Sequence, residues 1–175
     1  MVAAPLEGIR VIELGQLIAG PFCGQVLADF GAEVIKIEPP LKGDAMRQWG
    51  RPDANGNPVW WSVIARGKRS VTLDLRQPEG QDILRELIRD VDVLIENFRP
   101  GTMERWGLGY DALSDINPRL IMARVSGYGQ DGPYASRAGF RVSRSPACTC
   151  RAQPRRVHGG TQRRHGRTAG AGTPP

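Results

Sequence analysis

The chain has 175 residues, of which 40% are hydrophobic and 24% are charged, a balance that excludes fibrous, collagen-like and wholly disordered classes of protein. The formal net charge is +6, yet residues 141–175 hold eight of the 24 Lys and Arg and none of the 18 Asp and Glu. Residues 1–140 are therefore slightly acidic, and the charge does not indicate that this part binds nucleic acid.

The N-terminal segment has no basic stretch followed by an apolar one, and no run of about 18 apolar residues occurs anywhere in the chain. We therefore expect a soluble, cytoplasmic protein without membrane contact. Three cysteines, Cys23, Cys148 and Cys150, give no even disulfide framework and no C-x-x-C pair. We interpret Cys23 as a core residue, because a free cysteine behaves as a small buried hydrophobe.

The first elements alternate between strand and helix patterns. Residues 9–14 are short and β-branched, which predicts a buried strand. A helix is expected from about Pro21, with apolar residues at helical spacing until Gly31. Residues 33–38 predict the second strand, which Pro39 and the following proline end.

A long loop is expected over residues 40–58, which are rich in Gly, Pro, Asp and Asn. Residues 59–65 then predict a short helix, and the alternation over residues 70–75 predicts a strand. Pro78 opens a further helix with one apolar face, formed by Ile83, Leu84, Leu87 and Ile88.

The last elements repeat the same unit. Residues 92–98 predict a strand, a short helix begins near Pro100, residues 110–116 predict another helix, and residues 120–125 predict the last strand. Strands that alternate with helices at this spacing indicate an α/β, Rossmann-like parallel sheet with flanking helices. The glycines between residues 15 and 20 lack the G-x-G-x-x-G spacing of a nicotinamide site.

The composition changes after Phe140. Residues 141–175 contain no Leu, Ile, Phe, Met, Trp or Tyr, so we predict an Arg/Gly/Pro-rich disordered tail there and a partial domain over residues 1–140. One hypothesis is a frameshift in a GC-rich gene, which sequencing of codons 138–145 would test. The alternative is an Arg-rich RNA-binding arm, although the tail has no aromatic residue on which a base could stack.

Residues 5–140 contain a series of short sequence segments whose order along the chain can be compared with that of known protein families. They are P-L-E-G-I-R-V-I-E-L (5–14), A-G-P (19–21), D-F-G-A-E-V-I-K-I-E (29–38), G-D (43–44) with Arg47, K-R-S-V-T-L-D-L (68–75), D-V-L-I-E-N-F-R-P-G (92–101), L-G-Y (108–110), N-P-R-L-I (117–121) and G-Y-G-Q-D-G-P-Y (127–134). This series resembles the family III CoA-transferases of the CaiB/BaiF type.

The resemblance implies a coenzyme A site on a Rossmann-like domain and subunits that interlock as a homodimer. Coenzyme A and acyl-CoA would be substrates, no cofactor would be bound permanently, and we expect no nucleic-acid partner. By position in the family pattern, the nucleotide and pantetheine would lie against Ile18, Ala19, Leu73, Arg76, Asn97, Phe98, Arg99, Arg105 and Arg137. Some relatives have an arginine directly after the second strand, where this chain has Pro39.

Several of these residues also admit a purely structural interpretation. Lys68 and Arg69 could be an ordinary solvated pair, and Arg99 and Arg105 flank a short helix where surface charge is common. Asn97 is the strongest candidate, because open α/β sheets bind ligands at the carboxyl ends of their strands. The tryptophans at positions 49, 60 and 61 could stack on adenine, but we expect them to pack structurally.

The chemistry of the family would need a residue that we do not find. The resemblance implies acyl transfer through an enzyme aspartyl intermediate, whose Asp follows the equivalent of Phe140, and residues 141–175 contain no acid. We assign no catalytic residue and no metal site, and we expect the chain to be truncated before its nucleophile. The related α-methylacyl-CoA racemases would have a His at position 140, whereas His158 and His165 lie in the tail.

Three hypotheses follow about function. The first is a transferase fragment that is inactive alone and keeps some capacity to bind coenzyme A. The second is an enzyme that obtains the missing Asp from a partner subunit. The third is a non-enzymatic binding module that its Arg-rich tail attaches to nucleic acid, with salt-sensitive affinity. We also expect residues 1–140 alone to expose apolar surface and to be poorly soluble.

Overall fold

The computed structural model describes residues 3–56, 58–137, 139 and 149–152. Within these residues one sheet has the strand order β3-β2-β1-β4-β5-β6. Strands β1 to β5 pair in parallel, whereas β6 pairs antiparallel to β5. The bounds are β1 (Arg10–Glu13), β2 (Glu33–Glu38), β3 (Lys68–Thr72), β4 (Val93–Glu96), β5 (Ile121–Ser126) and β6 (Thr149–Ala152). The predicted parallel α/β sheet is thereby confirmed.

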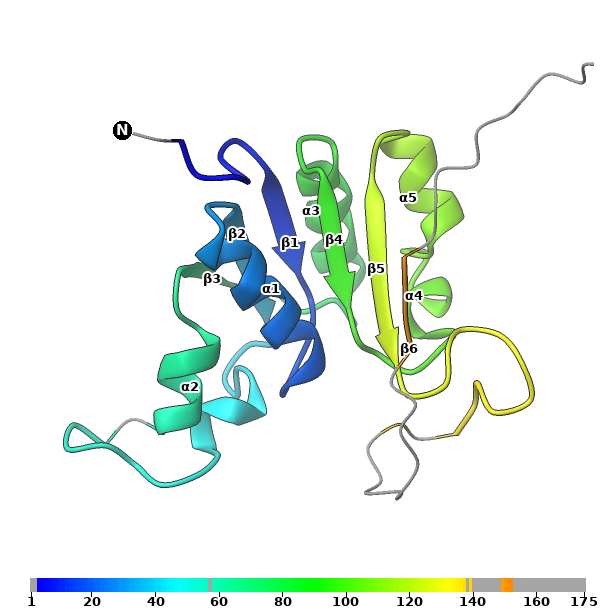
Figure 1. The fold of residues 1–175 in the computed structure, drawn as a ribbon. Helices are drawn as coiled ribbons and strands as arrows, with labels where there is room; N and C mark the ends of the chain where they lie inside the picture. Colours follow the sequence, from blue (N-terminus) through cyan, green and yellow to red (C-terminus); the bar gives the residue numbers. More distant parts are fainter. Residues whose placement is uncertain (1–2, 57, 138, 140–148, 153–175) are drawn as a thin grey trace, which may run out of the picture.

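Helices connect the parallel strands and cover both faces of the sheet. Figure 1 shows α1 in front of the sheet and α3 behind it, as right-handed crossovers on either side of β1 require. The bounds are α1 (Ala19–Asp29), the 3₁₀ helix η1 (Ala45–Gln48), α2 (Val59–Ile64), α3 (Pro78–Ile88), α4 (Thr102–Arg105) and α5 (Tyr110–Ile116). The helices predicted over 59–65, from Pro78 and over 110–116 are confirmed within a residue or two.

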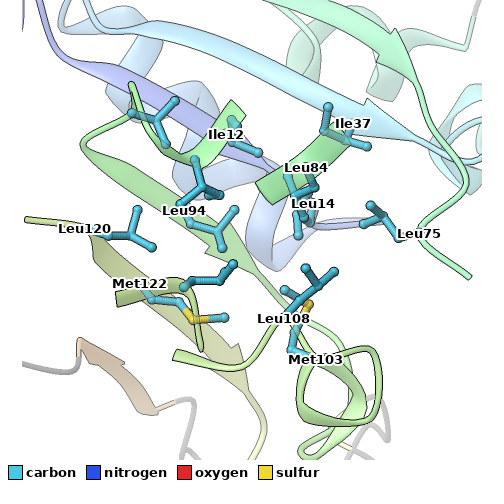
Figure 2. Packing of buried hydrophobic residues seen from close by; sticks show 13 residues of the cluster. Ile12, Leu14, Ile37, Leu75, Leu84, Leu94, Met103, Leu108, Leu120 and Met122 are labelled. Atoms are coloured by element: carbon cyan, nitrogen blue, oxygen red, sulfur yellow. The ribbon is translucent and has the colours of Figure 1, made fainter. Parts of the chain in front are cut away.

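The face covered by α3 and α5 contains the larger hydrophobic core (Figure 2). Helix α3 begins with Pro78 at its first turn, where the missing N–H costs no hydrogen bond. Leu84 and Ile88, four residues apart, are fully buried against the sheet, whereas Ile83 is half exposed. One helix stripe thus packs on alternate strand residues such as Leu94 and Met122.

The face covered by α1 contains a smaller apolar cluster. Val11, Val34 and Ile95 are buried there, and the partly buried Cys23 and Leu27 of α1 pack against them. Cys23 therefore belongs to the core, as its pattern predicted. The same face also buries charged side chains at the carboxyl ends of the strands, which are described below.

Strand β3 begins two residues before its predicted start and ends three residues before its predicted end. The alternation predicted residues 70–75, but the ladder with β2 runs from Lys68 to Thr72 and ends at the pair Glu38–Thr72. Beyond Glu38 the partner strand continues into Pro39, which has no N–H to offer a ladder. The apolar residues Leu73 and Leu75 therefore leave the strand and enter the loop at its carboxyl end.

The segment predicted as a disordered tail is described only in part. Its residues Thr149–Ala152 form β6, which pairs antiparallel with β5. The tail histidines, Cys148 and the other residues of 141–148 and 153–175 lie outside the described residues. The interpretation of those parts stays a prediction.

The described part of the chain exposes several large apolar side chains. Phe22 of α1, Phe30 directly after α1 and Trp60 of α2 are each more than half exposed. None of the described helices is long and apolar enough to cross a membrane. The expectation of exposed apolar surface is met at these positions, while the solubility of the chain stays a prediction.

Candidate functional site

A pocket opens at the carboxyl edge of the parallel sheet. The connections from β1 and β4 run in opposite directions across the strand order, so this edge has a topological switch point, where open α/β sheets bind ligands. The pocket encloses about 380 Å³ of empty space, its open mouth included, and is lined by Leu14, Gln16, Ile37, Glu38, Pro39, Leu73, Asp74, Leu75, Arg76, Phe98 and Trp106. Its position at the switch point makes it the candidate ligand site.

Three of the predicted site residues lie in the lining of this pocket: Leu73, Arg76 and Phe98. The ring of Phe98 packs edge-on against Trp106, with 5.3 Å between ring centroids and 75° between planes. The side chain of Arg76 is 70% exposed and pairs with Asp74, its Nε lying 2.8 Å from Oδ1. The pocket therefore combines an apolar wall with a cation at its mouth.

The side chain of Asn97 is hydrogen-bonded to the loop between β1 and α1, beside the pocket. Its Oδ1 accepts a hydrogen bond from the Gln16 N–H, and its Nδ2 donates to the Gln16 carbonyl, both at 2.8 Å. These two bonds use the amide group on the backbone of the loop between β1 and α1. The structure thus assigns Asn97 to shaping the site, and direct ligand contact by Asn97 stays a prediction.

Ile18 and Ala19 lie where that loop enters α1. Ile18 is the residue that precedes the helix, and its carbonyl accepts the N–H of Phe22 at 2.7 Å. The loop approaches the helix closely, because a Cβ at Gly15 would lie 2.8 Å from the Cα of Gly20. The glycines at these two positions are therefore explained by close backbone approach.

The other predicted arginines lie apart from the pocket lining. Arg99 and Arg105 are exposed, and Arg105 donates to Thr102 Oγ1 at 2.9 Å. Arg137 is also exposed and stacks over the ring of Tyr134, 4.3 Å from its centroid. Arg99 follows the carboxyl end of β4, and none of the three arginines lines the pocket.

Buried charges hold the strand ends together on the α1 face. Lys36 Nζ lies 2.8 Å from both Glu13 Oε1 and Asp44 Oδ2, and all three side chains are at most 1% exposed. Lys68 Nζ lies 2.5 Å from Glu13 Oε2 and is 2% exposed. Burial lowers the pKa of Lys68, against the effect of the neighbouring Glu13 carboxylate. We call Glu13, Lys36, Asp44 and Lys68 the buried charge network.

The interpretation of Lys68 and Arg69 as a solvated pair is wrong for one member and right for the other. Lys68 points into the sheet face beneath α1 and joins the buried charge network, because alternate residues of β3 point to opposite faces. Arg69 points the other way, is 78% exposed and pairs with Glu33.

A second charged group lies where β2 ends. Arg47 donates to both oxygens of Glu38, at 2.7 and 2.8 Å, and Ser70 Oγ donates to Glu38 at 2.5 Å. Burial alone would raise the pKa of Glu38, but these bonds and the Asp44 N–H lower it to about 2. Arg47 also stacks over Trp61, 4.0 Å from the ring, which gives that tryptophan the structural role expected of it.

Glu96 at the end of β4 and Arg124, its neighbour in β5, form a third buried pair. Arg124 Nε lies 2.7 Å from Glu96 Oε1, and its Nη1 lies 2.6 Å from Glu104 Oε1. The other carboxylate oxygen of Glu96, Oε2, accepts a hydrogen bond from the Phe98 N–H at 2.7 Å. Burial raises the pKa of Glu96, against the effect of Arg124. This pair fixes the backbone that presents Phe98 to the pocket.

Sequence reasoning missed several residues of the site. Gln16, Pro39 and Trp106 line the pocket, and the buried charge network supports the loops around it. Trp106 could have been noted as an aromatic that follows a short helix after a strand end. The network had no local signal, because its members are separated by 8 to 55 positions along the chain.

The fold and the site together define a class of protein. A parallel sheet in the order β3-β2-β1-β4-β5, with a pocket at its switch point, is a Rossmann-like α/β domain. The sequence comparison identifies the family within that class. The model of CoA-transferase family III matches residues 6–152, and the chain therefore belongs to this family.

Curated relatives and solved structures agree with that assignment. The chain is 62% identical over 136 residues to a succinyl-CoA–D-citramalate CoA-transferase of Chloroflexus aurantiacus, covering 78% of this chain and 34% of the relative. It is 48% identical to a succinate–glutarate CoA-transferase of Agrobacterium fabrum, covering 78% of this chain and 36% of that protein. A CaiB/BaiF family protein from Brucella suis superimposes with a TM-score of 0.73 at 45% identity, covering 79% of this chain and 37% of that one. The chain thus spans about a third of the length of these relatives.

Proposed function

We propose that this chain holds the coenzyme A moiety of an acyl-CoA at the carboxyl edge of its sheet, as the N-terminal part of an acyl-CoA:carboxylate CoA-transferase. The observation that carries the proposal is the switch-point pocket with Leu73, Arg76 and Phe98 in its lining. Family membership over residues 6–152 supports the same ligand class.

The residues of the pocket suit the two chemically different parts of coenzyme A. Leu73, Phe98 and Trp106 offer an apolar wall for the pantetheine arm. Arg76 stands at the mouth, where its Nε and Nη2 donate to the carboxylate of Asp74. Its remaining N–H groups would donate to a phosphate oxygen. Arg99, Arg105 and Arg137 would supply further cations along the same edge.

The names of the relatives indicate a substrate class. Two proteins of Chloroflexus aurantiacus that are 62% and 59% identical over 136 residues are named for succinyl-CoA with D-citramalate or L-malate as acceptor. We propose succinyl-CoA as the donor and a small dicarboxylate as the acceptor. In the complete reaction an enzyme aspartate would attack the acyl-CoA thioester and release the CoA thiolate, which would then attack the enzyme carbonyl of the mixed anhydride, release succinate and leave an aspartyl–CoA thioester. The acceptor carboxylate would attack this thioester and again release the CoA thiolate, which would take the acceptor's acyl group and regenerate the aspartate.

The chain itself would bind without completing this exchange. Residues 141–175 contain no Asp and no Glu, so the region expected to supply the nucleophile offers no carboxylate. We infer that the 175-residue chain has no transferase turnover alone. Interlocking with a second subunit and a cytoplasmic location stay predictions.

Calorimetric titration with coenzyme A tests the proposal. We expect saturable binding, weakened about three- to tenfold by Arg76→Gln through loss of a charge-assisted hydrogen bond. Arg89→Gln is the matched control, because Arg89 is also an exposed arginine paired with a nearby carboxylate, that of Glu86. Absence of saturable binding would contradict the proposal, and equal weakening by both substitutions would contradict the location of the site.

A transfer assay separates the inactive-fragment hypothesis from its competitors. The chain would be incubated with succinyl-CoA and L-malate or D-citramalate, and the new thioester would be measured. We expect none to form. Turnover by the chain alone would contradict this expectation, and turnover only after addition of a second protein would favour the partner-subunit hypothesis.

A further inference from the structure

The loop between β1 and α1 is held by side chains from three other parts of the chain. The Gly15 carbonyl accepts from Lys36 Nζ at 2.6 Å. Both backbone groups of Gln16 bind the side chain of Asn97. The Leu17 N–H donates to Asp44 Oδ1 at 3.0 Å. Three consecutive residues are thus tied to the sheet and to the loop that follows β2.

Leu17 has a backbone conformation that leucine rarely adopts. Its φ is +64°, in the left-handed region where a Cβ crowds the backbone. Such a conformation persists only where surrounding contacts over-determine it. The hydrogen bond from the Leu17 N–H to Asp44 is the contact made at the disfavoured residue itself.

Asp44 is built into the core of this arrangement. Its side chain is fully buried, with Oδ1 accepting from both Leu17 and Met46 and Oδ2 lying 2.8 Å from Lys36 Nζ. Its own N–H donates to Glu38 Oε2 at 2.8 Å. One carboxylate therefore joins the loop after β1, the end of β2 and the 3₁₀ helix η1.

The loop that Asp44 holds lies at the wall of the pocket. Gln16 lines the pocket directly, beside Pro39 and Glu38 at the end of β2. A change in the backbone at Leu17 would move Gln16 on one side and the first turn of α1 on the other. The conformation at Leu17 therefore sets the shape of the ligand wall.

We propose that Asp44 is a positioning residue for ligand binding: it holds the loop of residues 15–18 in its disfavoured conformation and so preorganises the pocket wall for coenzyme A. The proposal rests on the proposed function for the identity of the ligand. Asp44 does not line the pocket. Its effect on affinity passes through Leu17 and Gln16.

The test compares Asp44→Ala with Asp44→Asn in the full 175-residue chain. Asparagine keeps an Oδ1 acceptor for the Leu17 N–H, whereas alanine removes it. Two quantities are measured: hydrogen exchange of the Leu17 amide without ligand, and the Kd for coenzyme A. Asp29→Ala is the matched control, because Asp29 also pairs with a single basic side chain, Arg66, but at the surface.

We expect Asp44→Ala to speed Leu17 exchange and to raise the Kd about tenfold, the effect of a binding-competent loop populated about a tenth of the time. Asp44→Asn should keep Leu17 protected and restore most of the affinity, and Asp29→Ala should change neither quantity. If Asp44→Ala fails to fold, Asp44→Ser, which fills more of the space but cannot reach Leu17, replaces it with the same expectation.

Two results would overturn the positioning role. One is a folded Asp44→Ala or Asp44→Ser variant with Leu17 exchange and Kd as in the parent chain. The other is Asp44→Asn with a protected Leu17 amide but affinity as weak as that of Asp44→Ala, which would assign the effect to charge and not to the loop. If the parent chain does not bind coenzyme A, the proposed function fails, and the exchange rates of Leu17 still decide whether Asp44 holds the loop.

Discussion

The two faces of the sheet bury different kinds of side chain at the carboxyl ends of the strands and beneath the helices. The face under α3 and α5 is mainly apolar: Ile12, Leu94 and Met122 are fully buried there. Its one described buried ion pair, Glu96–Arg124, lies two residues beyond Leu94 and Met122 along β4 and β5. The face under α1 has a small apolar cluster at one end and, at the carboxyl end of the strands, the buried charge network. Alternate residues of the same strands supply the two faces, so β1 presents Ile12 to one and Glu13 to the other.

The difference separates the roles of stability and positioning. Apolar contacts are non-directional and tolerate small shifts, whereas buried ion pairs and hydrogen bonds have fixed partners and fixed geometry. The apolar face therefore accounts for most of the folding energy. The charged face determines where the loops at the pocket lie, and it does so by directed bonds to the backbone at Gly15, Leu17 and Pro21.

The largest effect is expected from breaking the charged face at its centre. Lys36→Met would remove the positive charge that lies between the buried carboxylates of Glu13 and Asp44. Removal of one partner of a buried ion pair costs about 3–5 kcal/mol of unfolding free energy. Urea unfolding measures the loss. The control is Arg66→Met, at an exposed pair with Asp29, where about 0–1 kcal/mol is expected. Equal losses would show that burial gives the network no special weight.

A somewhat smaller loss of unfolding free energy is expected from a substitution on the apolar face. Leu94→Ala would open a cavity at a fully buried position of β4, at a cost of about 2–5 kcal/mol. Ile83→Ala, at a half-exposed position of α3, should cost less than about 1 kcal/mol. The unfolding free energies from urea titration make the comparison, and a tolerant Leu94 would contradict the assignment of the folding energy to this face.

A glycine in α1 tests how tightly the helix packs on the charge network. A Cβ at Gly24 would overlap Glu13 Oε2, so Gly24→Ala should destabilise the chain by about 1–3 kcal/mol. The same change in an open helix would stabilise by about 0.5–1 kcal/mol. The direction in which the thermal unfolding temperature shifts therefore distinguishes the two cases. A stabilised Gly24→Ala variant would contradict close packing of α1 on the charge network.

Acid should weaken the charged face first. The pKa of Glu38 is lowered to about 2 in the folded chain, against about 4.3 in an unfolded one. Its contribution is therefore complete above about pH 4.3 and is lost as the pH falls towards about 2. Because Arg47 is 40% exposed, solvent screening limits the loss to about 1–2 kcal/mol. Stability against pH measures it, and Arg47→Gln should flatten the dependence over that range.

Much of the apolar face could be predicted from the sequence. The strand over residues 33–38 and the helix over residues 110–116 have the predicted bounds, because local periodicity reports which residues a helix or strand buries. The pocket residues Leu73 and Phe98 followed from the family pattern, and Phe98 followed also from its place at the end of a predicted strand. Their direct contacts with coenzyme A stay predictions.

The charged face could not be predicted in the same way. The segment E-V-I-K-I-E of β2 has the alternation of a half-exposed strand, yet Lys36 and Glu38 are buried. Their partners come from β1, from β3 and from the loop after β2, and local pattern carries no information about pairing over such separations. The role of Asn97 as a backbone clamp was hidden for the same reason, since Gln16 lies 81 residues away.

Hydrogen exchange of the full chain with and without coenzyme A tests the central claim most directly. The account predicts that the ligand slows exchange of the amides of residues 16–19 and 73–76, on the two sides of the switch-point pocket, while amides at the opposite ends of the strands keep their rates. Slower exchange confined to other parts of the chain, or no change at saturating coenzyme A, would contradict a coenzyme A site at the carboxyl edge of this sheet.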